Sequence, residues 1–504
     1  MRYRFTIPLL AATALAGCTV GPDFARPKAP ATEAYLPARE QATPAGAPGI
    51  AFGAGPVRRW WTAFGSPDLD ALVDRAIANN RSLAASNATL AAAQDELRAV
   101  AGRRLPQIDA TARVDQQQVN LAGFGFSGGN PLAPAGNPEF HLYSVGGGIS
   151  YDLDLFGGLR RQVEQSAAQV EAQQRQTEAA HLAIAGQVVN QVLTVAAIRA
   201  QVATANALLA DDLRNVDLTQ KRRAGGEGTL VEVLNAQSQY AADRGDIPQL
   251  EQQLAEARHL LATLVGVAPS ALGATDFDLA RLTLPTQVPV ALPSELVHRR
   301  PDILQAEANL HAAAAGIGVA TARLYPDITL GATVTQGAPG IGDLVKNAFR
   351  GYDIFAGLTA PIFHGGTLKA QRAAAIDRAR ASDATYQQTV LEAFQQVADL
   401  LSAIQSDARS VANQNESVSV ADHSRKLSRR SFQVGNSGTL QVLETERLYQ
   451  RSSNALVVAR TRQFLNVARL YVATAGGWVD AAQPQSLPAR QAVLGDVPDG
   501  AAAH

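Results

Sequence analysis

Residues 106–115, PQIDATARVD, are matched 220 positions later by residues 326–335, PDITLGATVT. The match belongs to a longer one, in which residues 80–111 align without a gap on residues 300–331. The offset falls to 208 between Gly157-Gly158 and Gly365-Gly366, so the first copy has a longer insert between its proline and its glycine pair. Self-similarity of this kind indicates that one structural unit occurs twice. We therefore expect a tandem repeat in each chain.

Both quoted stretches alternate apolar and polar residues. Ile108, Ala110, Ala112 and Val114 are separated by single polar residues, and a second alternating run leads to Leu155. The second copy has the same two runs. A period of two is typical of strands. The sequence predicts one β-hairpin at about 107–156 and another at about 327–363.

Two interpretations of these hairpins are open. Strands of about ten residues with one apolar face have the length and pattern of transmembrane β-barrel strands. A soluble hairpin that packs its apolar face on a core has the same pattern. Four strands cannot close a channel alone, and open strand edges are not tolerated in lipid. Either the hairpins are soluble or several chains pool their strands.

Long helices are expected between the hairpins. Apolar residues recur every seven positions along residues 188–216 and again along residues 390–418, which predicts supercoiling against neighbouring helices. No proline interrupts residues 159–220, so that helix could extend roughly 90 Å. A rod-like coiled coil explains the periodicity as well as a tube does.

A glycine-bearing turn and a returning helix follow each long helix. We expect repeat 1 over 66–270, with a long helix at 159–220, a tip turn at 224–229 and a helix at 230–265. Repeat 2 is expected over 287–478, with a long helix at 367–431, a tip turn at 434–439 and a helix at 440–475. Residues 479–504 are expected to form an irregular C-terminal tail.

The N-terminus carries the only cysteine of the 504 residues. A basic start and a short apolar run precede Leu15-Ala16-Gly17-Cys18, which predicts a secretory signal peptide over residues 1–17. Leu-Ala-Gly-Cys resembles the bacterial lipobox, in which the cysteine sulfur receives a lipid. We expect a lipid on Cys18 and an extended tether over 18–65, rich in Pro, Ala and Gly.

Composition excludes several classes of function. The formal net charge of −1 gives no electrostatic basis for binding nucleic acid. Past residue 18, charged, Gly or Pro residues interrupt every apolar run, so we expect no membrane-spanning helix. Residues 123–129, GFGFSGG, contain G-x-S-x-G and G-x-G-x-x-G, but they fall in a predicted hairpin loop and not in the contexts those motifs need. No HExxH motif occurs. We therefore expect no enzyme activity, no metal and no cofactor other than the covalent lipid.

These features together resemble the lipidated outer-membrane factors of the TolC type. The resemblance rests on residues 18–24, CTVGPDF, on Trp60-Trp61, on Phe156-Gly157-Gly158 and on a Val-Leu pair after each tip glycine. It implies a mostly helical chain with a membrane β-barrel. Three chains would share a twelve-stranded barrel in the outer membrane, continuous with a twelve-helix α-barrel tunnel. Two hairpins per chain, times three, agree with twelve strands.

The resemblance also implies a function and partners. The chain would be a passive, homotrimeric exit duct of a tripartite efflux pump in a Gram-negative outer membrane. A periplasmic adaptor (membrane fusion protein) would dock at the tip turns, which include Gly226, Thr229, Gly435 and Gly438. The inner-membrane pump would be of the resistance-nodulation-division type. A periplasm-spanning structural lipoprotein or adhesin without a pore is the alternative.

Charged residues gather at the tip turns. Ordinary helix-end electrostatics explains such placement as well as a gate does. In the family, acidic, tyrosine and arginine contacts close the periplasmic end, although Gln441 and Phe432 stand here where an acid and a tyrosine are usual. The expected gate residues are Glu232, Glu444, Arg222, Arg223, Arg429 and Arg430.

Overall fold

The computed structural model describes residues 19–28, 32, 34–37, 44–55, 57–118, 139–273 and 277–474. The chain divides into two compact units, each built from three separate stretches. Unit 1 comprises residues 1–31, 81–177 and 302–395, and unit 2 comprises residues 32–80, 178–301 and 396–504. Each repeat therefore contributes to both units.

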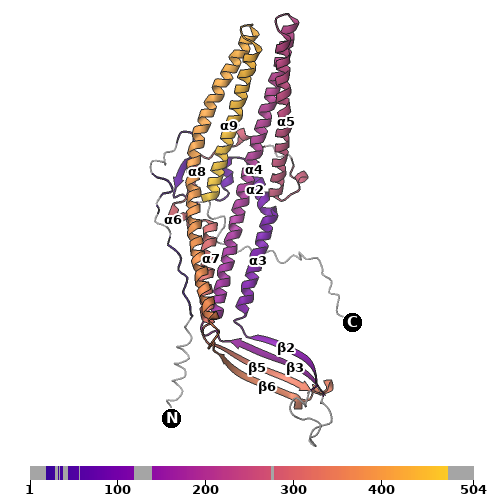
Figure 1. Ribbon diagram of the computed structural model, residues 1–504, viewed down its shortest axis with the longest axis vertical. Coiled ribbons are helices and arrows are strands. Elements are labelled where there is room, and N and C mark those ends of the chain that lie inside the picture. The colour runs from indigo at the N-terminus through magenta and orange to yellow at the C-terminus, as the bar shows by residue number, and fades with distance from the viewer. Residues whose placement is uncertain are drawn as a thin grey trace. The chain divides into compact units, whose positions relative to one another are not determined.

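Unit 1 contains one four-stranded antiparallel sheet (Figure 1). Its strands are β2 (Gln107–Gln118), β3 (Glu139–Asp152), β5 (Asp327–Ala338) and β6 (Arg350–Thr359), in the order β2-β3-β5-β6. Each repeat supplies one hairpin, and β3 pairs with β5 to join the two. Within the described residues, β2 and β6 are edge strands without a further partner.

The two faces of this sheet differ in chemistry. The register aligns one apolar residue from each strand in a row, namely Ile108, Ile149, Ala332 and Ile354. The adjacent row, on the opposite face, consists of Asp109, Gly148, Thr333 and Asp353. Ile108 is 78% exposed and Ile354 is 77% exposed. An uncovered apolar face opposite a polar one is typical of strands that contact lipid on one side.

Two strands end earlier than the alternating pattern predicts. β3 stops at Asp152 because Asp154 adopts a φ of 46° and caps the next helix, accepting the backbone N–H groups of Leu159 at 2.8 Å and Arg160 at 2.9 Å. β6 stops at Thr359, two residues before Pro361, and proline cannot donate a ladder hydrogen bond.

Unit 1 also holds helix α3 (Arg81–Gly102) and almost all of α7 (Pro301–Ala322), which lead into β2 and β5. The two long helices, α4 (Gly158–Ala224) and α8 (Thr367–Gln433), have 67 residues each and continue from unit 1 into unit 2.

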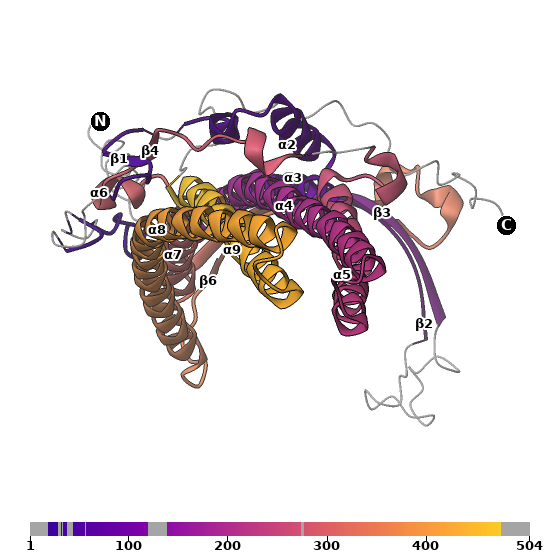
Figure 2. The ribbon, with the colours of Figure 1, turned by 90° about the horizontal axis from the view of Figure 1, so that it is seen from above.

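Unit 2 contains α2 (Pro67–Asn79), α5 (Leu230–Val265), α6 (Pro293–Leu296) and α9 (Thr439–Thr474). It also has the parallel strand pair β1 (Gly49–Phe52) and β4 (Gln287–Val290) (Figure 2), and Thr474 of α9 donates to the carbonyl of Pro289 in β4. An aromatic cluster forms part of its core: Trp60 stacks on Tyr471 at 5.5 Å between ring centroids, and Trp60 and Trp61 are at most 1% exposed.

The first helix predicted for each repeat is interrupted. α2 and α3 are separated at Asn80, whose backbone is extended and whose side-chain amide donates to the carbonyl of Leu264 at 2.8 Å. In repeat 2, residues 297–300 separate α6 from α7. The equivalent break position is Arg300, where the following Pro301 disfavours helix.

The expectation that no helix could span a membrane is wrong as a statement about composition. Within the described residues, α4 contains a stretch that is long and apolar enough to do so. Val188, Val192 and Leu193 are nevertheless fully buried inside unit 2, so its apolar side chains serve the packing of that unit.

Candidate functional site

Each long helix ends in a turn of the same geometry. Gly226 and Gly435 have φ angles of 80° and 83°. The N–H of Glu227 donates to the carbonyl of Arg222, and the N–H of Asn436 to that of Ser431, both at 2.9 Å. This is the Schellman arrangement, which needs a residue at positive φ and therefore favours glycine. The four residues predicted for adaptor docking, Gly226, Thr229, Gly435 and Gly438, are all exposed.

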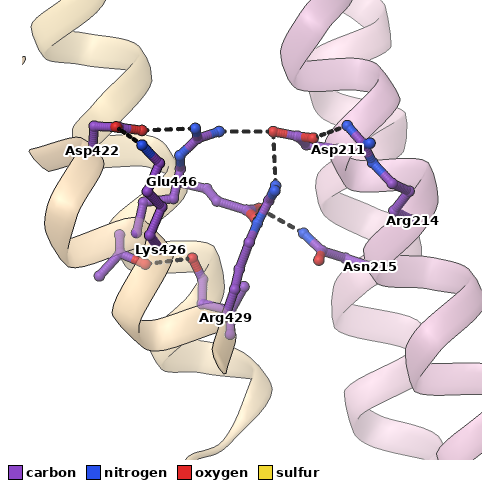
Figure 3. A network of polar contacts seen from close by, with 10 residues as sticks. Asp211, Arg214, Asn215, Asp422, Lys426, Arg429 and Glu446 are labelled. Atoms are coloured by element: carbon purple, nitrogen blue, oxygen red, sulfur yellow. Dashed lines mark hydrogen bonds and ion pairs between the residues drawn. The ribbon is translucent and has the colours of Figure 1, made fainter. Parts of the chain in front are cut away.

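Close to these turns, a polar network joins helices from both repeats (Figure 3). Arg429 on α8 is its centre. Its Nε donates to Glu446 Oε1 on α9 at 2.7 Å, and its Nη2 forms an ion pair with Asp211 Oδ2 on α4 at 2.7 Å. Asn215, one turn after Asp211, donates its Nδ2 to Glu446 Oε2 at 2.6 Å. α4 is therefore linked to both α8 and α9.

A second arginine repeats the link. Arg425 Nη1 donates to Asp211 Oδ2 at 2.9 Å, and Arg425 Nη2 donates to Asp422 Oδ1 at 2.8 Å. Its guanidinium lies 4.1 Å from the ring centroid of Tyr449. Nearer the turn, Arg222 of α4 lies 4.5 Å from the ring centroid of Phe432 on α8. Both arginine–ring contacts are of the cation–π kind.

The charged groups at the centre of this network are largely buried. Glu446 is 2% exposed, and burial raises its pKa although Arg429 and Asn215 act in the opposite direction. For Arg429, burial opposes the charge, but the contacts with Asp211 and Glu446 more than offset it and raise its pKa. Removing one partner from such a pair leaves the other charge buried and uncompensated.

A pair of carboxyl groups lies beside the network, between α4 and α5. Asp212 is 2% exposed, and Asp243 is the neighbouring carboxyl group that acts on it most. Burial raises the pKa of Asp212 to about 8, and Asp243 and the nearby carboxylates of Glu446 and Asp211 add to the shift. Burial disfavours the charged form of a carboxyl group, so Asp212 holds a proton at neutral pH.

Neither predicted gate acid, Glu232 or Glu444, forms an ion pair with the predicted arginines within the described residues. Glu232 belongs to a capping box: its carboxylate accepts the backbone N–H of Thr229 at 2.8 Å, and Thr229 Oγ1 accepts the N–H of Glu232 at 3.2 Å. Glu444 is exposed and forms no ion pair with the described residues. These contacts of Glu232 are therefore made at the start of its own helix.

The predicted arginines divide in two. Arg429 and Arg222 make the contacts described above. Arg223 and Arg430 are exposed, and no described residue pairs with either.

The network around Asp211 and Glu446 was not predicted, although the sequence holds a signal for Arg425 and for Asp212 beside it. The apolar track of α8 continues from Val418 to position 425, where an arginine stands, and then to Phe432. Asp212 lies three residues after Leu209, at the second core position of the heptad on α4. Charged residues at core positions of a heptad need partners, so these interruptions mark the network.

Other expected features lie outside the described residues. These are Cys18, residues 123–129 and the tail after residue 474. Among the residues that the structure describes, no group of three or more His, Cys, Asp or Glu side chains could hold a metal ion.

Comparison with known proteins identifies the class of protein. The family described as "Outer membrane efflux protein" matches residues 72–267 and 292–476, one segment for each repeat. A relative of Pseudomonas aeruginosa, the pyoverdine export outer membrane protein OpmQ, is 34% identical over 84% of this chain and 88% of its own length. The probable outer membrane lipoprotein SilC of Salmonella typhimurium is 26% identical over 92% of this chain and 97% of its own length. Among solved structures, that of the outer-membrane channel OprN has a TM-score of 0.81 and 27% identity, and covers 92% of this chain and 100% of its own.

The chain belongs to the outer membrane efflux protein family. The resemblance to TolC-type factors is confirmed, with its tandem repeat and mostly helical fold. The protein is an outer-membrane component of an efflux pump, and its family consists of channels, which are not enzymes and need no cofactor.

Proposed function

We propose that three copies of this chain form a passive exit duct, with a twelve-stranded barrel in the outer membrane and a twelve-helix tunnel continuous with it. The observation that carries this proposal is the four-stranded sheet of unit 1, which has an uncovered apolar face and two unpaired edges. Open edges are not tolerated in lipid, and joining β2 of one copy to β6 of the next removes all of them. Three copies with four strands each give twelve.

Oligomerisation and membrane insertion should then be inseparable. The test introduces single cysteines along β2 and along β6 and oxidises the membranes. Pairs in the correct register should give covalent trimers, since closed rotational symmetry repeats one interface three times. A membrane-inserted monomer that is stable in mild detergent would end the proposal.

The lipid on Cys18 and the partners belong to the same proposal. A periplasmic adaptor would dock at the exposed tip turns, and a resistance-nodulation-division pump would supply the energy. SilC is named a lipoprotein and OpmQ is named for pyoverdine export, which supports a lipid anchor and a small secreted molecule as cargo. Crosslinking in cells followed by co-purification would identify the adaptor and the pump.

The tips would also hold the gate. The contacts of Arg429 and Arg425 keep α4 against α8 and α9 within one chain, while Glu444, Arg223 and Arg430 remain exposed and available to neighbouring chains. Replacing Glu232 and Glu444 by alanine should raise single-channel conductance, and rising salt should open the parent more easily. If a trimeric double mutant conducts like the parent at both salt concentrations, these two acids are ordinary helix-end charges.

A further inference from the structure

The segment directly after the lipidation site is bound to unit 1 by specific contacts. We call residues 19–26 the strap. The strap contains no helix or strand, and it is held by hydrogen bonds and ion pairs. The N–H of Val20 donates to the carbonyl of Phe156 at 3.1 Å, which fixes the strap to the turn between β3 and α4.

Arg161, in the first turn of α4, is the centre of the surface that receives the strap. It is 4% exposed. Its Nε donates to the carbonyl of Val20 at 3.2 Å, and its Nη2 donates to Asp23 Oδ1 at 2.7 Å and to the carbonyl of Gly21 at 3.4 Å. On its other side, Nη1 donates to Glu164 Oε2 at 2.7 Å. Arg161 is thus a buried guanidinium whose three nitrogen atoms all donate hydrogen bonds, and two of them bind the strap.

α7 forms the other side of this surface. Phe24 stacks on His311 at 4.3 Å between ring centroids, and Arg26 Nε donates to Glu307 Oε1 at 2.6 Å. The carboxylate of Glu307 is 8% exposed, so the strap supplies the counter-charge of a buried acid.

Two glycines permit the close approach. A Cβ on Gly21, whose φ is 94°, would lie 2.5 Å from the Cα of Gly318 on α7. A Cβ on Gly318 would lie 2.7 Å from Cγ of Arg161. The strap, Arg161 and α7 therefore meet at a point where there is room for no further atom.

We propose that this surface of α4 and α7 is a docking site for the lipoprotein N-terminus of the same chain, and that docking fixes the lipid of Cys18 beside the joint between barrel strands and helices. Cys18 precedes Thr19 by one residue, which spans at most about 3.6 Å. The acyl chains therefore enter the membrane next to the barrel wall. Lipid and strap act as one unit in assembly, and Arg161 is the positioning residue.

Gly318→Ala tests the docking site most directly. Alanine favours helix more than glycine, so this change should not weaken α7 by itself, but its methyl group displaces Arg161 or the strap. Gly316→Ala is the matched control, because its Cβ meets only Gln165 Nε2 at an ordinary 3.5 Å. Hydrogen exchange at the Val20 amide should rise at least about tenfold in Gly318→Ala and stay at the parent rate in Gly316→Ala. Equal protection in all three proteins would overturn the docking site.

A double-mutant cycle tests the coupling to the lipid. The amount of trimer in the outer membrane is measured for the parent, Arg161→Met, Cys18→Ser and the double variant, with palmitate labelling as a check on acylation. Coupling requires that Arg161→Met lowers the yield of the lipidated protein but adds no further loss to Cys18→Ser. Loss by the same factor in both backgrounds, or no loss in either, would overturn it.

If Arg161→Met does not fold, Asp23→Ala with Phe24→Ala tests the same coupling from the strap side. This inference rests on the proposed trimeric duct. The experiments above test docking, through hydrogen exchange and trimer yield. Failure of the duct proposal would instead appear as a lack of conductance in the assembled parent protein.

Discussion

At the residue scale, Asp212 makes stability depend on pH. Its folded-state pKa is about 8, raised first by burial and then by Asp243 and neighbouring carboxylates. The unfolded chain releases this proton near pH 4, so the folded state binds one more proton between about pH 4 and 8 and its stability falls as pH rises through that window. The melting temperature of the parent should therefore fall between pH 6 and pH 9.

Asp212→Asn keeps the shape of the side chain without the titration, so its melting temperature should change less between those two pH values. Asp211→Asn is the matched control. Asp211 binds Arg425 and Arg429, so its loss should lower the melting temperature at both pH values. Because Asp211 makes only the smallest contribution to the raised pKa of Asp212, Asp211→Asn should flatten the curve much less than Asp212→Asn does. Equal pH dependence in the parent and Asp212→Asn would contradict the assignment.

Arg429→Met should destabilise unit 2 strongly. Glu446 would remain buried without its counter-charge, which costs about 3–5 kcal/mol. Arg430→Met, at the exposed neighbouring position, should stay within about 0.5 kcal/mol of the parent. Denaturant melts of the purified proteins measure both. Adding Glu446→Gln should recover part of the loss, and no recovery would show that Arg429 acts through something other than this charge.

At the element scale, the two faces of the sheet predict opposite responses to one substitution. Ala332 lies in the apolar row of β5, and Thr333 lies in the polar row beside it. A lysine on the lipid face costs about 2–4 kcal/mol near the bilayer centre and far less in a water-filled lumen. Ala332→Lys should therefore lower the inserted fraction at least about tenfold, since ~1.4 kcal/mol is a factor of ten.

Thr333→Lys should insert like the parent, and membrane fractionation compares the two. If both variants insert equally well, the apolar row does not face lipid.

The helices and hairpins could be read from the sequence because their signals are local. Periods of two and seven give β2, β3, β5 and β6 and the two long helices to within a few residues. Strand ends depend on single residues such as Asp154, whose cap and positive φ no periodicity reveals. Arg429 binds Asp211 on α4, and Arg161 binds the carbonyl of Val20, 141 positions earlier, so identifying these partners requires the folded chain.

The tip network also shows where the repeats have diverged. At an offset of 209, Arg425 corresponds to Val216 and Asp211 to Val420. Repeat 1 thus supplies Asp211, which links α4 to α8, while repeat 2 supplies Arg425 and Arg429, which bind it. The internal repeat therefore predicts where the helices and strands lie, but it does not predict the residues of this network.

At the scale of the whole molecule, the proposed duct has two membrane attachments, the lipid on Cys18 and the barrel strands. Cys18→Ser should remove the lipid yet leave part of the trimer in the outer membrane, because closed barrel strands hold more firmly than acyl chains. Fractionation with palmitate labelling measures this. Complete release of folded mutant protein into the periplasm would contradict the second attachment.

The central claim is that the assembled protein is an open-ended duct whose tips regulate passage. The most direct test is the conductance of purified protein in planar bilayers, without adaptor, pump or energy source. We expect discrete current steps that are proportional to voltage, and larger steps or more frequent opening when Arg425→Met and Arg429→Met separate α4 from α8 and α9. Folded trimers that enter the bilayer and carry no current, in the parent and in this double variant alike, would contradict the account.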